Sequence, residues 1–184
     1  MNKIVMILAC AMMFIIACDN KQSETQENKV IAENKVEQNV EKETVATNPD
    51  APIWEQIAGR PEIFNQEFAK LSDVDKYYFC SAFTIVAMSV SKPDTASAMK
   101  NYFLGLGVAK HNRGIDDETY KAFDFGKNII LSELVVEDIL ANKTCENIII
   151  EASDFAKENN YTTEQINDMG KVEVEKVIKY INKN

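Results

Sequence analysis

Hydrophobic and polar positions divide the chain into three stretches. An unbroken apolar run covers residues 4–17, a polar stretch without aromatic residues covers 19–52, and the remainder repeats apolar positions with a helical period. We find no convincing run of the strict apolar–polar alternation that marks a half-buried β-strand. The pattern predicts one all-α domain over residues 53–184, preceded by a flexible acidic linker over residues 18–52 that has no core of its own.

Capping residues and helix breakers divide the domain into a bundle of about six or seven helices. Pro61 and Pro93 each suit the first turn of a helix. Thr162 and Gln165 match a capping box, which satisfies two backbone N–H groups at a helix start. The expected helices cover about residues 53–58, 61–71, 74–90, 93–107, 117–141, 145–158 and 163–181.

The third and fifth of these helices are expected to differ from the others. Residues 77–91 carry no charge, and fifteen residues are too few to span a bilayer, so this segment is interpreted as the buried central helix. The fifth helix, from Asp116 or Asp117 onward, is expected to be long and continuous. Several late apolar positions share the helical period and are therefore expected in the core, among them Leu131, Leu134, Ile178 and Ile181.

The amino terminus has the features of an export signal. Lys3 precedes an apolar run that is too short for a permanent transmembrane helix, and the chain turns polar directly after Cys18. Residues 15–18, Ile-Ile-Ala-Cys, resemble the lipobox of bacterial lipoproteins. The resemblance covers residues 1–18 only. It implies that residues 1–17 are removed as a signal peptide and that Cys18 carries a lipid such as palmitate.

This resemblance implies a location and leaves part of it open. A lipid on Cys18 holds the chain on a membrane of the cell envelope, facing the periplasm or the cell surface. Asp19 follows directly, as in lipoproteins that enteric bacteria keep in the inner membrane. Other bacteria do not all obey that rule, so inner and outer membranes both stay open.

Removal of the signal peptide leaves a strongly acidic chain. It takes away Lys3 and no acidic residue, which leaves 19 basic and 29 acidic residues and a formal net charge of −10. Such a surface argues against nucleic acid, whose phosphates need Lys and Arg. It favours a basic protein partner, although solubility alone explains the same charge.

Two cysteines remain in the mature chain after Cys18 is lipidated. Cys80 lies in the middle of the predicted central helix and Cys145 at a later helix start. In an exported protein a single disulfide between them is expected, and it would stabilise the fold by about 4 kcal/mol. The alternative is a pair of buried, reduced cysteines that pack as small apolar residues.

Side chains with catalytic or ligand-binding chemistry do not form a recognisable set. His111 is the only histidine and lies in a polar loop, where solvent exposure is the expectation. Three acids at residues 116–118 are explained by capping and by the helix dipole rather than by a cation site. Glycines 105 and 107 lack the setting of a phosphate loop. We therefore expect no catalytic residue, no cofactor and no metal.

One aromatic cluster stands out in the central helix. Tyr77 and Tyr78 lie close in sequence to Phe83, and core packing is the simplest interpretation. The alternative is that these side chains line a small apolar cavity between helices.

Three functions follow in order of preference. The first is a non-catalytic, membrane-tethered lipoprotein whose domain binds another protein of the envelope, in an inhibitor-like, immunity-like or assembly role. The second is a carrier of a small apolar ligand or lipid, and the third is a hydrolase that uses His111.

Overall fold

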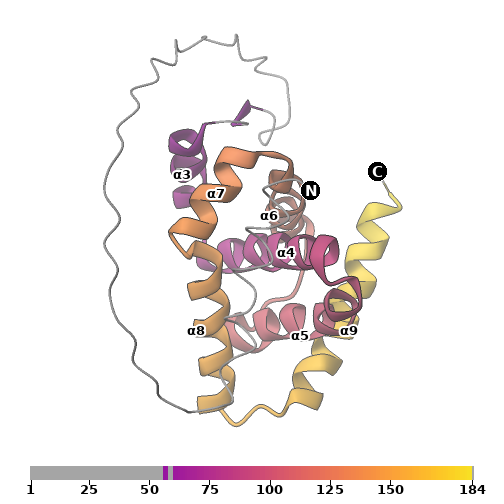
Figure 1. Cartoon of the computed structure of the whole chain (residues 1–184). Helices are drawn as coiled ribbons and strands as arrows, with labels where there is room; N and C mark the ends of the chain where they lie inside the picture. Colours follow the sequence, from indigo (N-terminus) through magenta and orange to yellow (C-terminus); the bar gives the residue numbers. More distant parts are fainter. Residues whose placement is uncertain (1–55, 58–59, 184) are drawn as a thin grey trace, which may run out of the picture.

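The computed structural model describes residues 56–57 and 60–183 (Figure 1). This part of the chain contains no strand, which confirms the all-α prediction. The predicted signal peptide, Cys18, the linker and most of the first predicted helix lie outside the described residues. The helices of residues 60–183 are Pro61–Lys70 (α3), Asp73–Ser91 (α4), Pro93–His111 (α5), Asp117–Asn128 (α6), the 3₁₀-helix Ile129–Leu131 (η2), Glu133–Ala141 (α7), Thr144–Glu158 (α8) and Thr163–Ile181 (α9).

Helix α4 is the centre of the bundle, as its uncharged sequence predicts. Ser72 caps its start by accepting a hydrogen bond from the backbone N–H of Asp75. Helices α5, α6 and α8 pack against it from different sides (Figure 1). Eleven of its residues are buried, and they do not lie on a single stripe, which is the arrangement expected of a helix surrounded by others.

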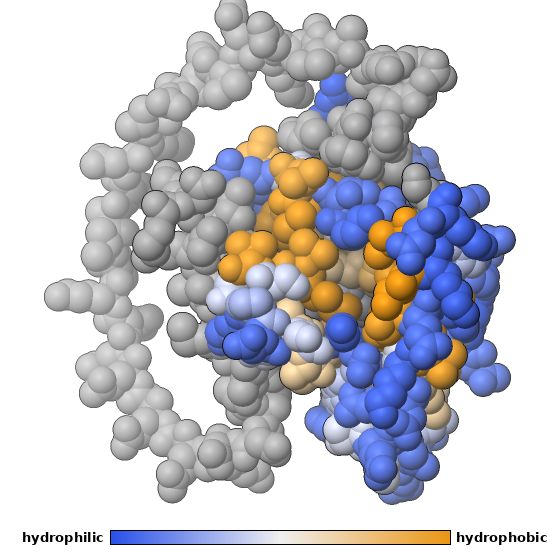
Figure 2. Space-filling view, turned by 90° about the vertical axis from the view of Figure 1, so that its right-hand side faces the viewer, coloured by the Kyte–Doolittle hydropathy of each residue, from blue (hydrophilic) through white to orange (hydrophobic). Residues whose placement is uncertain are grey.

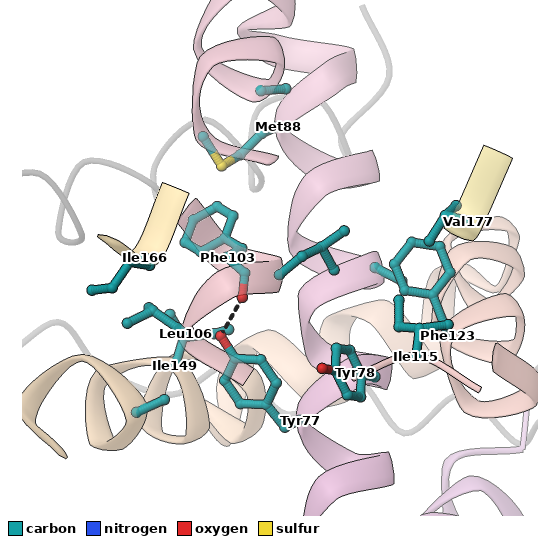
Figure 3. Packing of buried hydrophobic residues seen from close by; sticks show 14 of the residues in the cluster. Tyr77, Tyr78, Met88, Phe103, Leu106, Ile115, Phe123, Ile149, Ile166 and Val177 are labelled. Atoms are coloured by element: carbon teal, nitrogen blue, oxygen red, sulfur yellow. Dashed lines mark hydrogen bonds between the residues drawn. The ribbon is translucent and has the colours of Figure 1, made fainter. Parts of the chain in front are cut away.

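The buried side chains of α4 divide between two hydrophobic clusters. Tyr77 and Tyr78 belong to a cluster shared with α5, α6, α8 and α9 (Figure 3). Phe79 and Phe83 belong to a second cluster, which includes aromatic residues of α3 and aliphatic residues of α7. A helix that supplies both clusters ties the two halves of the domain together.

Glycines let α9 cross α5 with their backbones almost in contact. A Cβ atom at Gly105 would collide with the carbonyl oxygen of Ile166, and one at Gly170 would collide with that of Asn101. Helix α5 continues through Gly105 and the following glycine to His111, so these glycines serve helix packing and do not end the helix.

The prediction of one continuous fifth helix is wrong. The chain forms α6, then the short η2, and then α7 after Ser132, whose backbone is extended with ψ of 98°. This break redirects the chain, so that α7 packs against α3 and α8. As a result Val135, Val136 and Ile139 are buried in the second cluster. A helix that continued in the direction of α6 would not have placed them there.

Candidate functional site

The two cysteines expected to pair form a disulfide. Cys80 of α4 and Cys145 of α8 have Cα atoms 4.9 Å apart, and both residues are buried. The bond joins positions 65 residues apart in sequence, and it fixes the start of α8 against the central helix. The prediction of a disulfide-pinned bundle is therefore confirmed.

The three aromatic residues proposed as cavity lining do not converge on one place. Tyr77 and Tyr78 are fully buried in the first cluster, whereas Phe83 belongs to the second. The Tyr77 hydroxyl donates to the backbone oxygen of Phe103 at 2.6 Å, as Figure 3 shows, and the Tyr78 hydroxyl donates to that of Arg113 at 2.8 Å. Burial raises the pKa of both tyrosines, so both stay protonated donors.

Packing around Tyr77 is tight. A Cβ atom at Gly107 would lie 2.7 Å from its ring, and the rings of Tyr77 and Tyr78 meet edge to face with centroids 5.8 Å apart. The sequence alternative of a ligand cavity beside Tyr77 gains no support from this geometry.

The structure corrects the expected position of His111. It is the last residue of α5 and is partly buried, not a solvated loop residue. Its ring centroid lies 5.7 Å from that of Tyr77. Desolvation and the neighbouring Lys110 lower the pKa of His111. Among the described hydrogen bonds none involves its ring nitrogens, so no carboxylate–histidine–nucleophile arrangement is built around it.

The three acids at residues 116–118 do what their position predicts. Asp116 and Thr119 form a reciprocal capping box at the start of α6, and Arg113 donates to the carboxylates of Asp116 and Glu118. Asp117 accepts a hydrogen bond from Tyr180 at 2.6 Å, which raises the pKa of that tyrosine to about 12. The bond between Tyr180 and Asp117 docks the end of α9 on α6.

Sequence reasoning missed a buried carboxylate, Glu173. Only 3% of this residue is exposed, and its carboxylate accepts the backbone N–H of Ile115 at 2.5 Å and an ion pair from Lys176 at 2.8 Å. It holds the α5–α6 loop against α9. The signal was present in the sequence: Glu173 falls on the core face of α9, which it shares with Ile166, Gly170 and Val177.

A shallow polar pocket lies between α5 and the start of α9. Its volume is about 530 Å³. The ion pair of Asp168 with Lys171, 2.7 Å long, forms part of its wall. The pocket is open to solvent, and the residues that line it are Ala98, Asn101, Thr163, Glu164, Asn167, Asp168 and Lys171.

The solvent-facing side of α7, together with the η2 turn before it, is the most unusual surface of the described domain. Leu131 is 72% exposed and Leu134 is 52% exposed, which corrects the expectation that both lie in the core. Glu133 and Glu137 are exposed one helical turn apart beside Leu134, and neither has an ion-pair partner among the described residues. We call these four residues the acidic α7 face.

A second exposed apolar site lies at the end of α9. Ile178 and Ile181 are 50% and 51% exposed, which again corrects their expected burial. Lys179 and Lys183 flank them in the last turns, and neither has an acidic partner among the described residues; the Lys183 ammonium lies 5.5 Å from the Tyr180 ring centroid. Glu175 is exposed one helical turn before Lys179, and Asp117 accepts from the neighbouring Tyr180, so this end of α9 carries charges of both signs. Figure 2 views the molecule from the side of α9, where apolar surface lies in strips beside polar surface.

Comparisons with known proteins place this chain in no family. No family model, no curated protein and no solved structure matches it. None of the described helices has both the length and the hydropathy of a membrane span. Within the same residues, no three His, Cys, Asp or Glu side chains are grouped to hold a metal ion.

Proposed function

We propose that this chain is a bacterial envelope lipoprotein, held on a membrane by a lipid on Cys18, and that its helical domain binds another protein without catalysing a reaction. The lipobox-like residues 15–18 and the abrupt change from apolar to polar sequence support the anchor. The polar residues 19–52 give the domain reach from the membrane surface. The protein-binding part depends on the exposed surface of the domain.

The acidic α7 face is the observation that carries the binding proposal. Contact of the Leu131 and Leu134 side chains with water is unfavourable in the isolated domain. Covering this apolar surface with a partner would be favourable. Glu133 and Glu137 form no ion pair among the described residues. A basic partner could therefore form ion pairs with both without breaking an ion pair of the domain. The surface therefore fits a partner that presents apolar side chains flanked by lysine or arginine.

A pull-down from solubilised envelopes tests the proposal. The full chain carrying Leu131→Ser and Leu134→Ser is compared with the unchanged chain and with Ile150→Ser, which alters an exposed isoleucine of α8. We expect the α7 double variant to capture at least tenfold less partner than the unchanged chain, while Ile150→Ser captures the same amount. Capture that is equal for all three chains, or no protein enriched by any of them, would contradict binding through α7.

A further inference from the structure

We propose that the exported chain is glycosylated on the side-chain amide of Asn160, in the turn between α8 and α9. The acceptor motif for N-linked glycans is Asn-X-Ser or Asn-X-Thr, where X is any residue except proline. The chain contains this motif twice, as Asn-Lys-Thr at residues 142–144 and as Asn-Tyr-Thr at residues 160–162. The inference goes beyond the proposed function and rests only on its export step, because glycans of this kind are carried by secreted chains.

The turn that carries Asn160 is exposed and has a defined conformation. Asn160 has a φ of 59°, in the left-handed region, and its backbone N–H donates to the oxygen of Lys157 at 3.1 Å. The N–H of Tyr161 donates to the oxygen of Ala156 at 3.0 Å, which completes the end of α8. Thr162 then caps α9. Asn160 and Thr162 are both exposed, so a transferase can reach the two positions that define the motif.

The structural roles of these two residues do not require this pair of residue types. Glycine suits the left-handed position after α8 better than asparagine does. Aspartate or serine would cap α9 at least as well as threonine. Glycosylation, in contrast, requires an amide at position 160 and a hydroxyl group at position 162 together.

The Asn160 amide is available for modification. Its neighbour Asn159 donates its amide to the backbone oxygen of Phe155 at 2.8 Å, whereas none of the described hydrogen bonds involves the side chain of Asn160. Glu158, two residues earlier, is exposed and has no ion pair in the described part of the chain. Its carboxylate can therefore be bound by a basic side chain of a transferase.

The motif at residues 142–144 is less available. The Asn142 amide donates to the carboxylate of Asp138 at 3.1 Å, and Thr144 is the first residue of α8. The next residue, Cys145, is buried and bonded to α4 through the disulfide. A transferase that draws this motif into its binding groove would have to displace a pinned helix start. Modification is therefore expected at Asn160 and not at Asn142.

The surroundings of the turn leave room for a glycan. None of the exposed large apolar side chains of the described domain lies between residues 151 and 171, so this surface lacks the apolar patch that marks a protein contact. Figure 1 shows the turn at the opposite end of the bundle from α3 and α7. A glycan on Asn160 would thus leave the acidic α7 face uncovered.

The modification forms one covalent bond and breaks one. The donor is an oligosaccharide whose anomeric carbon is joined to a lipid diphosphate. The Asn160 Nδ2 atom attacks this carbon, the bond from the carbon to the diphosphate oxygen breaks, and the lipid diphosphate leaves with the electron pair of that bond. Nδ2 loses one proton to a base of the transferase. The step needs no oxidant or reductant.

Mass spectrometry of the full chain, purified from the bacterium that encodes it, tests the proposal. Trypsin cleaves after Lys157 and Lys171 and releases residues 158–171, which contain the motif with Asn160. We expect this peptide to carry a glycan and electron-transfer fragmentation to place it on Asn160. The peptide of residues 128–143, which contains Asn142, should be unmodified. An unmodified peptide 158–171, a glycan on Thr162, or a glycan on Asn142 instead of Asn160 would overturn the proposal.

Variants separate the motif from the fold. Thr162→Asp keeps a side chain that caps α9 and removes the hydroxyl group, so we expect at least tenfold less glycan. Thr162→Ser keeps both and should remain modified. Asn160→Gly suits the left-handed turn and should lose the glycan, whereas the matched control Asn142→Gln should retain it. Unchanged modification in Thr162→Asp, or loss of the glycan in Asn142→Gln, counts against Asn160 as the acceptor.

The outcomes also separate this inference from the proposed function. A chain that has lost residues 1–17 and carries the lipid, but has an unmodified peptide 158–171, overturns the glycan and leaves the proposed function standing. A glycan on Asn160, together with no protein captured through α7, supports the inference and contradicts protein binding. An unmodified chain that retains residues 1–17 contradicts both, because the anchor and the glycan each require export.

Discussion

Glycine at single positions decides how closely the helices of this domain approach. At the crossing of α5 with α9, Gly105 faces the carbonyl oxygen of Ile166 and Gly170 faces that of Asn101. In both places the neighbour is backbone, which cannot rotate away as a side chain can. The contact between these two helices therefore depends on the absence of a Cβ atom.

Replacing Gly170 with alanine tests this dependence, because the sign of the change in unfolding free energy distinguishes a close crossing from an ordinary helix position. In an ordinary helix Gly→Ala stabilises by about 1 kcal/mol. Here the added methyl group would push α9 away from α5, and overpacking of this kind costs about 1–3 kcal/mol. We expect Gly170→Ala to lower the free energy of unfolding in urea. Asn167→Ala on the same helix is the control, and it should leave stability within about 0.5 kcal/mol or raise it. A stabilised Gly170→Ala variant would contradict the close crossing.

The environment of His111 gives a pH dependence of stability. Partial burial and Lys110 lower its pKa in the folded domain, while Asp73 and Glu151 partly oppose the shift. The unfolded chain, with an ordinary pKa of about 6.5, therefore takes up the proton first as pH falls. Stability should fall on acidification through that value, and the loss should level off below the folded pKa.

Substitution of His111 by glutamine isolates the contribution of this histidine to the pH dependence of stability. Since it is the only histidine of the chain, few other side chains titrate between pH 7.5 and 5.5. We expect the unfolding free energy of His111→Gln, measured by urea titration, to change less between these two pH values than that of the unchanged protein. Identical changes in both proteins would show that the surroundings of His111 do not disfavour its charge.

At the scale of elements, the sequence determines most helix starts because each depends on local chemistry. Thr162 caps a helix as predicted, Asp116 is one of the two residues expected to open one, and Pro61 and Pro93 begin helices where expected. These signals involve a few neighbouring residues, so no knowledge of the packed structure is needed to interpret them.

The break between α6 and α7 could not be predicted in the same way. Residues 129–132, which separate the two helices, include no proline or glycine, and Ile129, Ile130 and Leu131 fit a helical period as well as they fit η2. What ends the helix is the second cluster, which Val135 and Ile139 can join only if the chain changes direction. Such a gain is tertiary and leaves no local signature. The same break exposes Leu131 and Leu134, so the candidate binding surface could not be predicted either.

The disulfide between α4 and α8 should contribute strongly to stability because it closes a long loop. On the chain-entropy model a loop of this length gives about 4 kcal/mol. We expect the Cys80→Ala, Cys145→Ala double variant to unfold at lower urea concentration than the oxidised protein. The reduced protein, with both thiols verified by titration, should unfold near the double variant. Equal midpoints for the oxidised and reduced forms would show that the bond adds nothing to stability.

At the scale of the whole molecule, charge and apolar exposure are distributed unevenly. The acidic α7 face has two exposed glutamates beside its leucines, whereas the end of α9 has lysines and acids together beside its exposed isoleucines. Net charge alone, which is all that composition provides, suggests a basic partner and does not indicate where on the surface it would bind. The arrangement of helices shows which glutamates stand beside exposed leucines.

The membrane anchor is a property of the whole molecule, and it rests on one residue. If Cys18 carries the lipid, cells supplied with alkyne-labelled palmitate should yield a labelled chain that sediments with membranes and lacks residues 1–17. Cys18→Ser should remove the label and leave the signal peptide uncleaved. Cys10→Ser, which alters the other amino-terminal cysteine, is the matched control and should keep both label and cleavage. An unlabelled native chain, or label that persists in Cys18→Ser, would contradict the anchor. The proposed location of the domain on a membrane would then have no basis, whereas the helical domain and its acidic α7 face would remain as described.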